Sequence, residues 1–129
     1  PHISGAIALG AAIKWMESVG LENIAAHELA LTKYAHEKLL QIEGLRIYGT
    51  ADTKAGVVSF LVEGTHPSDL GTLLDQLGIA VRTGHHCTEP LMDWYKIPGT
   101  VRASFGAYNT FDEIDALVAA LERAIKMLK

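Results

Sequence analysis

The sequence predicts an α+β domain in two layers, with helices packed on a mainly antiparallel sheet. Three observations support this prediction. Segments with apolar residues at helical spacing alternate with short apolar segments typical of strands. Glycine, proline or a capping residue stands at most of the boundaries between them. The length of 129 residues suits one core, so residues 1–129 are expected to form a single domain.

Two helices are expected at the start of the chain, each ending at a glycine. Ser4 can cap the first helix, over residues 4–19, because its hydroxyl can accept a hydrogen bond from a free backbone N–H. Asn23 can cap a longer second helix, over residues 23–43, by the same chemistry.

Two strands and a third helix should follow. Strands are predicted over residues 45–48 and 57–62, with a loop over residues 49–56 between them. The second strand is apolar enough along its length to be central in the sheet. Pro67 opens the third helix, where the missing N–H of proline costs little, and Gly78 ends it.

The last part of the chain alternates strands and helices. A strand is predicted over residues 79–82, a short helix over 91–95 and a further strand over 101–105. Thr110 and Glu113 have the spacing of a capping box, which predicts the start of the final helix. The expected order is helix, helix, strand, strand, helix, strand, helix, strand, helix.

The composition excludes several classes of function. The net charge is −4 and lysine and arginine are scattered singly, so no nucleic-acid surface is expected. The longest apolar run is interrupted by Lys14 and is too short to cross a membrane. A single cysteine excludes an internal disulfide framework and predicts a reducing, cytoplasmic location. The chain begins at Pro1, close to an apolar helix, which indicates a fragment of a longer protein.

The cysteine lies in the most informative segment of the chain. Cys87 follows His85 and His86 directly, in a short loop that begins after Arg82. A lone thiol on a loop, beside groups that can carry positive charge, is typical of a reactive thiolate. The alternative is a small apolar residue kept for packing, which would more often lie within an apolar run.

A metal site at the same loop is a further alternative. His85, His86 and Cys87 are adjacent, so their side chains diverge, and a closed zinc site needs four ligands. Two other histidines, His27 and His36, lie among charged residues of the second helix and are expected at its solvated surface. No cysteine pair has the spacing of a zinc motif.

Arg102 lies in the middle of a predicted strand, between apolar neighbours. Such an arginine often pairs with a carboxylate of the protein itself. It can equally hold the carboxylate of a substrate with two parallel hydrogen bonds. The residues alone leave both interpretations open.

These segments resemble a known family. Residues 81–92 are similar to the active-site loop of the SufS-type (group II) cysteine desulfurases, within the class-V aminotransferase group of fold-type I pyridoxal phosphate (PLP) enzymes. Residues 101–105, 108–110 and 113–115 match in the same order and spacing. Residues 4–10 resemble the helix that leads into the C-terminal domain of these enzymes. The resemblance covers the whole chain and implies their small C-terminal domain.

The resemblance also implies a reaction and roles for residues. These enzymes convert L-cysteine to L-alanine and leave a persulfide on a cysteine, which matches Cys87. Arg102 matches the arginine that binds the substrate carboxylate, and Arg82, His85 and His86 match loop residues around the thiol. The full-length enzyme would be a homodimer that passes sulfur to a Suf-type acceptor protein for iron–sulfur cluster assembly. Many members also act on L-selenocysteine.

The chain departs from the family in what it lacks. The lysine, histidine and aspartate that hold PLP in the family belong to a larger domain upstream, and no lysine of this chain lies in a matching motif. The chain alone is therefore expected to bind no PLP and to be inactive. A selenocysteine lyase on the same scaffold is one alternative, and a stand-alone thiol or metal-binding module is another.

Overall fold

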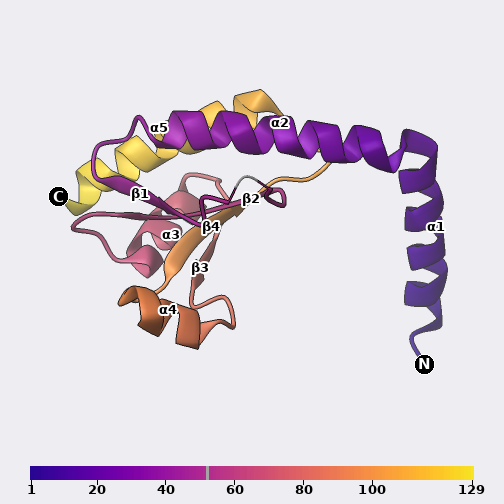
Figure 1. Cartoon of the computed structure of the whole chain (residues 1–129), viewed down its shortest axis with the longest axis horizontal. Helices are drawn as coiled ribbons and strands as arrows, with labels where there is room; N and C mark the ends of the chain where they lie inside the picture. Colours follow the sequence, from indigo (N-terminus) through magenta and orange to yellow (C-terminus); the bar gives the residue numbers. More distant parts are fainter. Residues whose placement is uncertain (52) are drawn as a thin grey trace.

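The computed structural model describes residues 1–51 and 53–129. The predicted loop over residues 49–56 includes Asp52, which lies outside the described residues. The helices and strands occur in the predicted order (Figure 1). In chain order they are α1 (Ile3–Val19), α2 (Leu21–Leu39), β1 (Leu45–Tyr48), β2 (Val57–Val62), α3 (Pro67–Gln76), β3 (Arg82–Gly84), α4 (Glu89–Tyr95), β4 (Thr100–Ser104) and α5 (Phe111–Leu128).

The strands form a four-stranded sheet in the order β1-β2-β4-β3, and each neighbouring pair is antiparallel. The predicted α+β class is therefore confirmed. The central position predicted for β2 is also confirmed, because β2 pairs with β1 on one side and β4 on the other. The short strand β3 pairs only with β4 among the described residues and lies at an edge of the sheet.

One face of the sheet forms the hydrophobic core. Side chains alternate between the two faces of a strand, and in β2 every second residue is buried. Val58 and Phe60 are opposite Ala103 and Val101 on this face, which packs against helices α2, α3 and α5. Each fully buried large apolar side chain contributes about 1.5–3 kcal/mol. Figure 1 shows α2 and α5 side by side on one side of the sheet and α4 on the other.

Several predicted helix boundaries are confirmed. The Thr110 hydroxyl accepts from the Glu113 N–H at 3.3 Å, and the Glu113 carboxylate accepts from the Thr110 N–H at 2.9 Å, so the capping box is present. Pro67 is at the start of α3, as predicted. The backbone φ of Gly78, just after α3, is 80°, a conformation that glycine adopts without steric cost.

The caps predicted for the first two helices are wrong. Helix α1 begins before Ser4, and His2 caps it through Nδ1, which accepts from the Gly5 N–H at 2.7 Å. Asn23 lies inside the first turn of α2, and its side-chain amide donates to the Val19 carbonyl at 2.7 Å. Asn23 therefore satisfies a free backbone carbonyl at the end of α1 instead of a free backbone N–H at the start of α2.

Two further predicted boundaries are also wrong. The strand expected over residues 79–82 begins only at Arg82, because the Ile79 N–H donates to the Leu74 carbonyl and keeps this segment attached to the end of α3. Helix α2 ends at Leu39 instead of residue 43. The Ile42 N–H donates to the Leu39 carbonyl, three residues earlier, so the chain has already tightened into a turn.

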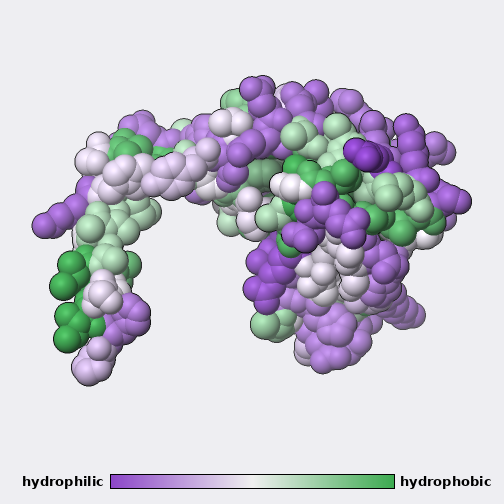
Figure 2. All heavy atoms as spheres, turned by 180° about the vertical axis from the view of Figure 1, so that it is seen from behind, coloured by the Kyte–Doolittle hydropathy of each residue, from purple (hydrophilic) through white to green (hydrophobic). Residues whose placement is uncertain are grey.

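Helix α1 projects from the end of α2, away from the sheet (Figure 1). None of its residues is buried. Large apolar side chains, among them Ile3, Ile7 and Leu9, are exposed along it, and Figure 2 shows apolar atoms gathered on this arm. Its apolar composition does not make it a membrane span: no described helix is both long and apolar enough to cross a bilayer.

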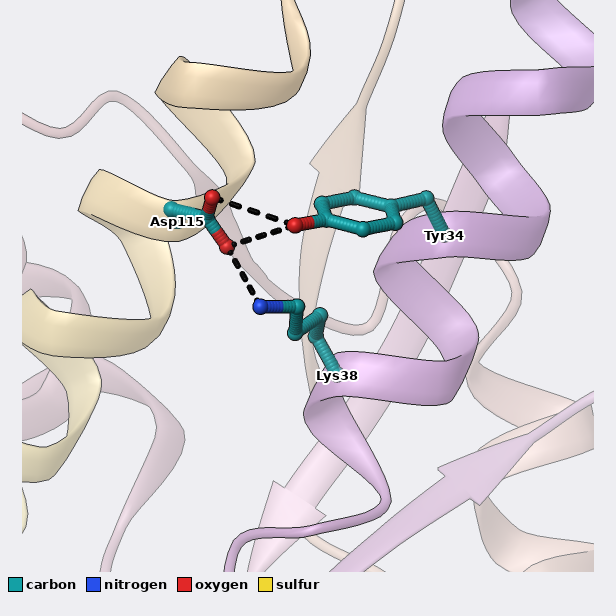
Figure 3. Close-up of polar contacts among 3 residues, drawn as sticks. All are labelled: Tyr34, Lys38 and Asp115. Carbon is teal, nitrogen blue, oxygen red and sulfur yellow. Dashed lines mark hydrogen bonds and ion pairs between the residues drawn. The ribbon is translucent and has the colours of Figure 1, made fainter.

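A polar cluster joins α2 to α5 at the surface (Figure 3). The Lys38 ammonium lies 2.9 Å from Asp115 Oδ1, and the Tyr34 hydroxyl donates to both carboxylate oxygens at 2.9 and 3.1 Å. The hydrogen bond from Lys38, and then that from Tyr34, holds the pKa of Asp115 below its ordinary value of 3.8. The same contact raises the pKa of Lys38.

We expect Asp115→Asn to lower the free energy of unfolding near neutral pH, because the amide loses the ion pair with Lys38. A carboxyl with a lowered pKa in the folded state stabilises the protein above the ordinary pKa and ceases to do so as pH falls through the folded-state value. The difference between wild type and variant should therefore shrink in acid. Urea unfolding between pH 7 and pH 2 measures it, with Glu122→Gln on the same helix as the control. A difference that stays constant with pH would contradict this assignment.

Candidate functional site

The polar face of the sheet presents one row of side chains that crosses all four strands. The pairing register aligns Tyr48 of β1 with Ser59 of β2, Ser59 with Arg102 of β4, and Arg102 with Arg82 of β3. Residues directly opposite in a sheet lie on the same face, so the row lies opposite the hydrophobic core. Thr100 is two residues from Arg102 in β4 and belongs to this face as well.

Two guanidinium groups are adjacent in this row. Arg82 and Arg102 are directly opposite each other in β3 and β4. Like charges in this position destabilise a sheet, so the pair is not there for the stability of the strands. Arg102 is half-buried, and its Nε is buried without a hydrogen-bond partner among the described residues. The arrangement gathers positive charge that suits an anionic ligand.

Cys87 lies in a tight turn between β3 and α4. The Thr88 N–H donates to the His85 carbonyl at 2.9 Å and closes the turn. The two central residues, His86 and Cys87, have φ of 55° and 61°. Residues other than glycine rarely adopt this left-handed backbone conformation, which costs about 1–3 kcal/mol of conformational free energy for each residue. The thiol is exposed, and Arg82 Nη2 lies 4.0 Å from its sulfur.

The two histidines of the loop have different surroundings. His86 is half-buried, and its Nε2 lies 2.9 Å from the Thr100 hydroxyl and 3.1 Å from the Thr100 carbonyl. Burial, and then the nearby Arg102 charge, lowers the pKa of His86 despite the opposing effect of the Thr100 carbonyl. His85 is exposed, and its Nδ1 lies 3.8 Å from the Glu89 carboxylate. His86 therefore belongs to the sheet face and His85 to the surface.

A cavity of about 420 Å³ lies over this face. Its size is within the range of small-molecule sites. Three side-chain nitrogens are buried without a partner among the described residues: Lys54 Nζ, His86 Nδ1 and Arg102 Nε. All three residues line this one cavity. Unpaired buried polar groups are costly, so their concentration in one place indicates a site for a ligand that pairs with them.

The structure brings the predicted site residues into one region but not into one pocket. Arg102 and His86 line the cavity, whereas Cys87 and His85 lie on the loop at its edge and Arg82 lies on β3. The described part of the chain holds no group of three or more His, Cys, Asp or Glu residues placed to bind a metal.

Sequence reasoning missed several residues of the cavity. Tyr48, Ser59, Lys54 and Thr100 line it and were not predicted to belong to a site. Ser59 could have been recognised from the sequence, because it is the single polar residue in the apolar strand β2. Tyr48 needed the pairing register, which the sequence does not give. Lys54 lies between β1 and β2, and Thr100 lies just outside the strand predicted over residues 101–105.

The prediction that His27 is solvated is also wrong. His27 is half-buried, and its Nε2 lies 2.9 Å from the Asn109 carbonyl, 82 residues away in the sequence. His36 is half-buried as well, and burial, followed by the charge of Lys54, lowers its pKa. The prediction relied on the charged residues next to these histidines in the sequence, and such neighbours do not tell which side of α2 the rings lie on.

The fold and the site define a small α+β domain with a cysteine loop and an arginine pair at an open sheet face. The sequence profile described as Aminotransferase class-V matches residues 1–117. This match covers most of the chain, and the chain belongs to the class-V aminotransferase family.

Cysteine desulfurases are among its relatives. A probable cysteine desulfurase of Halalkalibacterium halodurans is 50% identical over 123 residues, which are 95% of this chain and 30% of the relative. A cysteine desulfurase of Serratia proteamaculans is 49% identical over 128 residues, or 99% of this chain and 31% of the relative. The chain therefore spans about 30% of the length of these relatives.

Solved structures agree with this relation. The cysteine desulfurase CsdA of Escherichia coli superimposes with a TM-score of 0.91 at 36% identity, covering 100% of this chain and 32% of that chain. The apo cysteine desulfurase of Thermococcus onnurineus NA1 superimposes with a TM-score of 0.92 at 43% identity, covering 98% and 32%. The fold described above is thus the fold of one part of these larger enzymes.

Proposed function

We propose that this chain is the small C-terminal domain of a PLP-dependent, SufS-type cysteine desulfurase. The full-length enzyme converts L-cysteine to L-alanine and carries the sulfur away as a persulfide on Cys87. The observation that carries this proposal is that three residues lining one cavity each have a buried side-chain nitrogen with no partner among the described residues, beside the only thiol of the chain. The relatives of this chain described above are cysteine desulfurases, and this supports desulfuration of L-cysteine as the reaction.

Arg102 is the group that binds the substrate. Its guanidinium lies on the cavity face with Nε unpaired, and a guanidinium fits a carboxylate through two parallel hydrogen bonds. Lys54 Nζ adds a second positive charge to the same cavity. The carboxylate of L-cysteine would satisfy a buried donor that the described residues leave unsatisfied. This supports the substrate-binding interpretation of Arg102 over an ion pair within the protein.

Cys87 is the group that takes the sulfur. Its thiolate attacks the sulfur of L-cysteine, an S–S bond forms, and the carbon–sulfur bond breaks with its electron pair left on carbon. The carbon then gains a proton, which yields L-alanine. The exposed position of Cys87 allows the persulfide to meet a Suf-type acceptor protein for iron–sulfur cluster assembly. Arg82, 4.0 Å from the sulfur, supplies a positive charge beside it.

The residues present fit the substrate end of a PLP site. The nitrogens of Lys54 and Arg102 that have no partner among the described residues suit a carboxylate, and PLP supplies an electron sink for the breaking bond when it is bound. Arg102 would hold the amino acid against it, and the groups that hold the ring are proposed to lie elsewhere in the full-length homodimer. A cytoplasmic location suits the exposed free thiol.

The test is the release of alanine and of protein-bound sulfur from L-cysteine by the full-length enzyme with PLP, a reductant and an acceptor protein. Stoichiometric alanine and sulfur transfer would support the desulfurase. Release of alanine only from L-selenocysteine would instead support the second candidate, a selenocysteine lyase. That candidate gains support from the position of Cys87 outside the lining of the cavity, since a lyase does not need attack by the thiol.

A further inference from the structure

His86 makes a contact that favours one position for its ring proton. Its Nε2 is within hydrogen-bond distance of both the hydroxyl and the backbone carbonyl of Thr100. A carbonyl can only accept and a hydroxyl can accept as well, so a proton on Nε2 satisfies both contacts. A neutral imidazole has one N–H, and Nδ1 is then a bare acceptor. Thr100 is only 1% exposed, so this anchor is held within the folded sheet.

The same ring lines the cavity. His86 Nδ1 is buried and has no hydrogen-bond partner among the described residues, and His86 lines the cavity together with Arg102. Burial and the adjacent positive charge of Arg102 favour the neutral ring. A neutral imidazole with a free lone pair at a ligand cavity is the arrangement of a general base.

We propose that His86 Nδ1 accepts the thiol proton of the substrate, and that Thr100 is the positioning residue that fixes the required tautomer. This rests on the proposed function, because the proton comes from L-cysteine. The sulfur to be transferred must approach Cys87 from the cavity, and His86 is the residue of the same loop whose basic side chain lines that cavity.

The step is a simple proton transfer. As the S–S bond to Cys87 forms, the S–H bond of L-cysteine breaks, its electron pair stays on sulfur, and an N–H bond forms at Nδ1. A thiol of pKa near 8.5 is mostly protonated at neutral pH, so a base that takes this proton lets the persulfide form as its anion. The imidazolium then returns its proton to the departing product or to water. Arg102 disfavours the imidazolium, which speeds this return.

The charge environment of His86 sets the expected pH dependence. Arg102 and Arg82 face it from the sheet, His85 from its own loop, and Lys54 from the segment between β1 and β2. The hydroxyls of Tyr48 and Tyr95 are the titratable groups of the cavity on β1 and α4. Once Nδ1 is protonated it cannot accept, so kcat/KM should fall as pH drops through the lowered pKa of His86.

The ring state can be measured without turnover. In the 129-residue chain labelled with ¹⁵N-histidine, NMR should find His86 neutral at pH 7, protonated on Nε2, and titrating below 6.5. A ring protonated on Nδ1, or one that titrates at or above 6.5, would overturn the proposal.

The role in turnover needs variants of the full-length enzyme. His86→Gln keeps a donor for the Thr100 carbonyl but has no group equivalent to Nδ1. It should lose at least about 100-fold in kcat and lose the acidic limb of the pH profile. Alkylation of Cys87 by iodoacetamide, followed by mass spectrometry, should keep its wild-type rate if the loop is intact. Wild-type kcat in His86→Gln would refute the role of His86.

Thr100 provides the matched pair of variants. Thr100→Val has the same shape without the hydroxyl and should lower kcat/KM about fivefold, the effect of one hydrogen bond. Thr100→Ser restores the hydroxyl and should recover most of that loss. Equal rates in both variants would remove the Thr100 hydroxyl from the mechanism. Absence of L-cysteine turnover by the wild-type enzyme would instead refute the proposed function, so the two failures are distinguishable.

Discussion

Cys87→Ser in the full-length enzyme is expected to abolish sulfur transfer from L-cysteine to an acceptor protein, by at least about a thousandfold. Serine has nearly the same shape, but its hydroxyl is not ionised near neutral pH and cannot hold a persulfide. The side chain lies on an exposed turn and makes no contact with the core, so the fold should persist. Transfer of ³⁵S from labelled L-cysteine to the acceptor measures the effect directly.

L-selenocysteine serves as the internal control for this variant. Release of selenium does not need attack by the thiolate, so Cys87→Ser should keep much of its activity on L-selenocysteine while it loses the activity on L-cysteine. Retained activity also shows that PLP is bound and that the variant is folded. Equal sulfur transfer by wild type and Cys87→Ser would show that Cys87 is not the sulfur carrier.

Arg102→Gln is expected to lower kcat/KM for L-cysteine by about 100-fold or more, which corresponds to about 2.7 kcal/mol. The variant removes the positive charge that is proposed to bind the substrate carboxylate, in a half-buried position where water replaces it poorly. Arg102→Lys should recover little of the loss, because an ammonium cannot make two parallel hydrogen bonds to a carboxylate.

Steady-state kinetics of both Arg102 variants check this expectation, and Arg123→Gln, at an exposed position on α5, is the control for the loss of one positive charge. The apparent affinity for L-alanine, which keeps the carboxylate and lacks the thiol, should fall in parallel. An Arg102→Gln enzyme with wild-type kcat/KM would mean that the substrate carboxylate is bound by another group, such as Lys54.

Local chemistry was sufficient to predict most of the fold. Thr110 and Glu113, Pro67 and Gly78 mark element boundaries through interactions within a few residues of each, and the structure agrees at all of them. The wrong boundaries come from contacts between elements. Asn23 was expected to cap its own helix, but its side chain bonds to the end of the preceding one.

The same distinction applies to the site. Cys87, His86 and Arg102 were found from residue type and order. Tyr48 was missed because only the pairing of β1 with β2, and of β2 with β4, places it in one row with Arg102. The contact between His86 and Thr100 was missed as well, since a sequence does not tell which ring nitrogen meets which partner.

The register of β3 against β4 has a consequence for how sequence changes act on this domain. β4 is held by β2 on its other side and side chains alternate strictly between faces, so a shift of this pairing by one residue would turn Arg82 of the edge strand β3 away from the face that carries Arg102. The connection between these strands contains the Cys87 turn and α4. Insertion or deletion of a single residue there would therefore be more damaging than most point changes, although every chemically active side chain would remain in the chain.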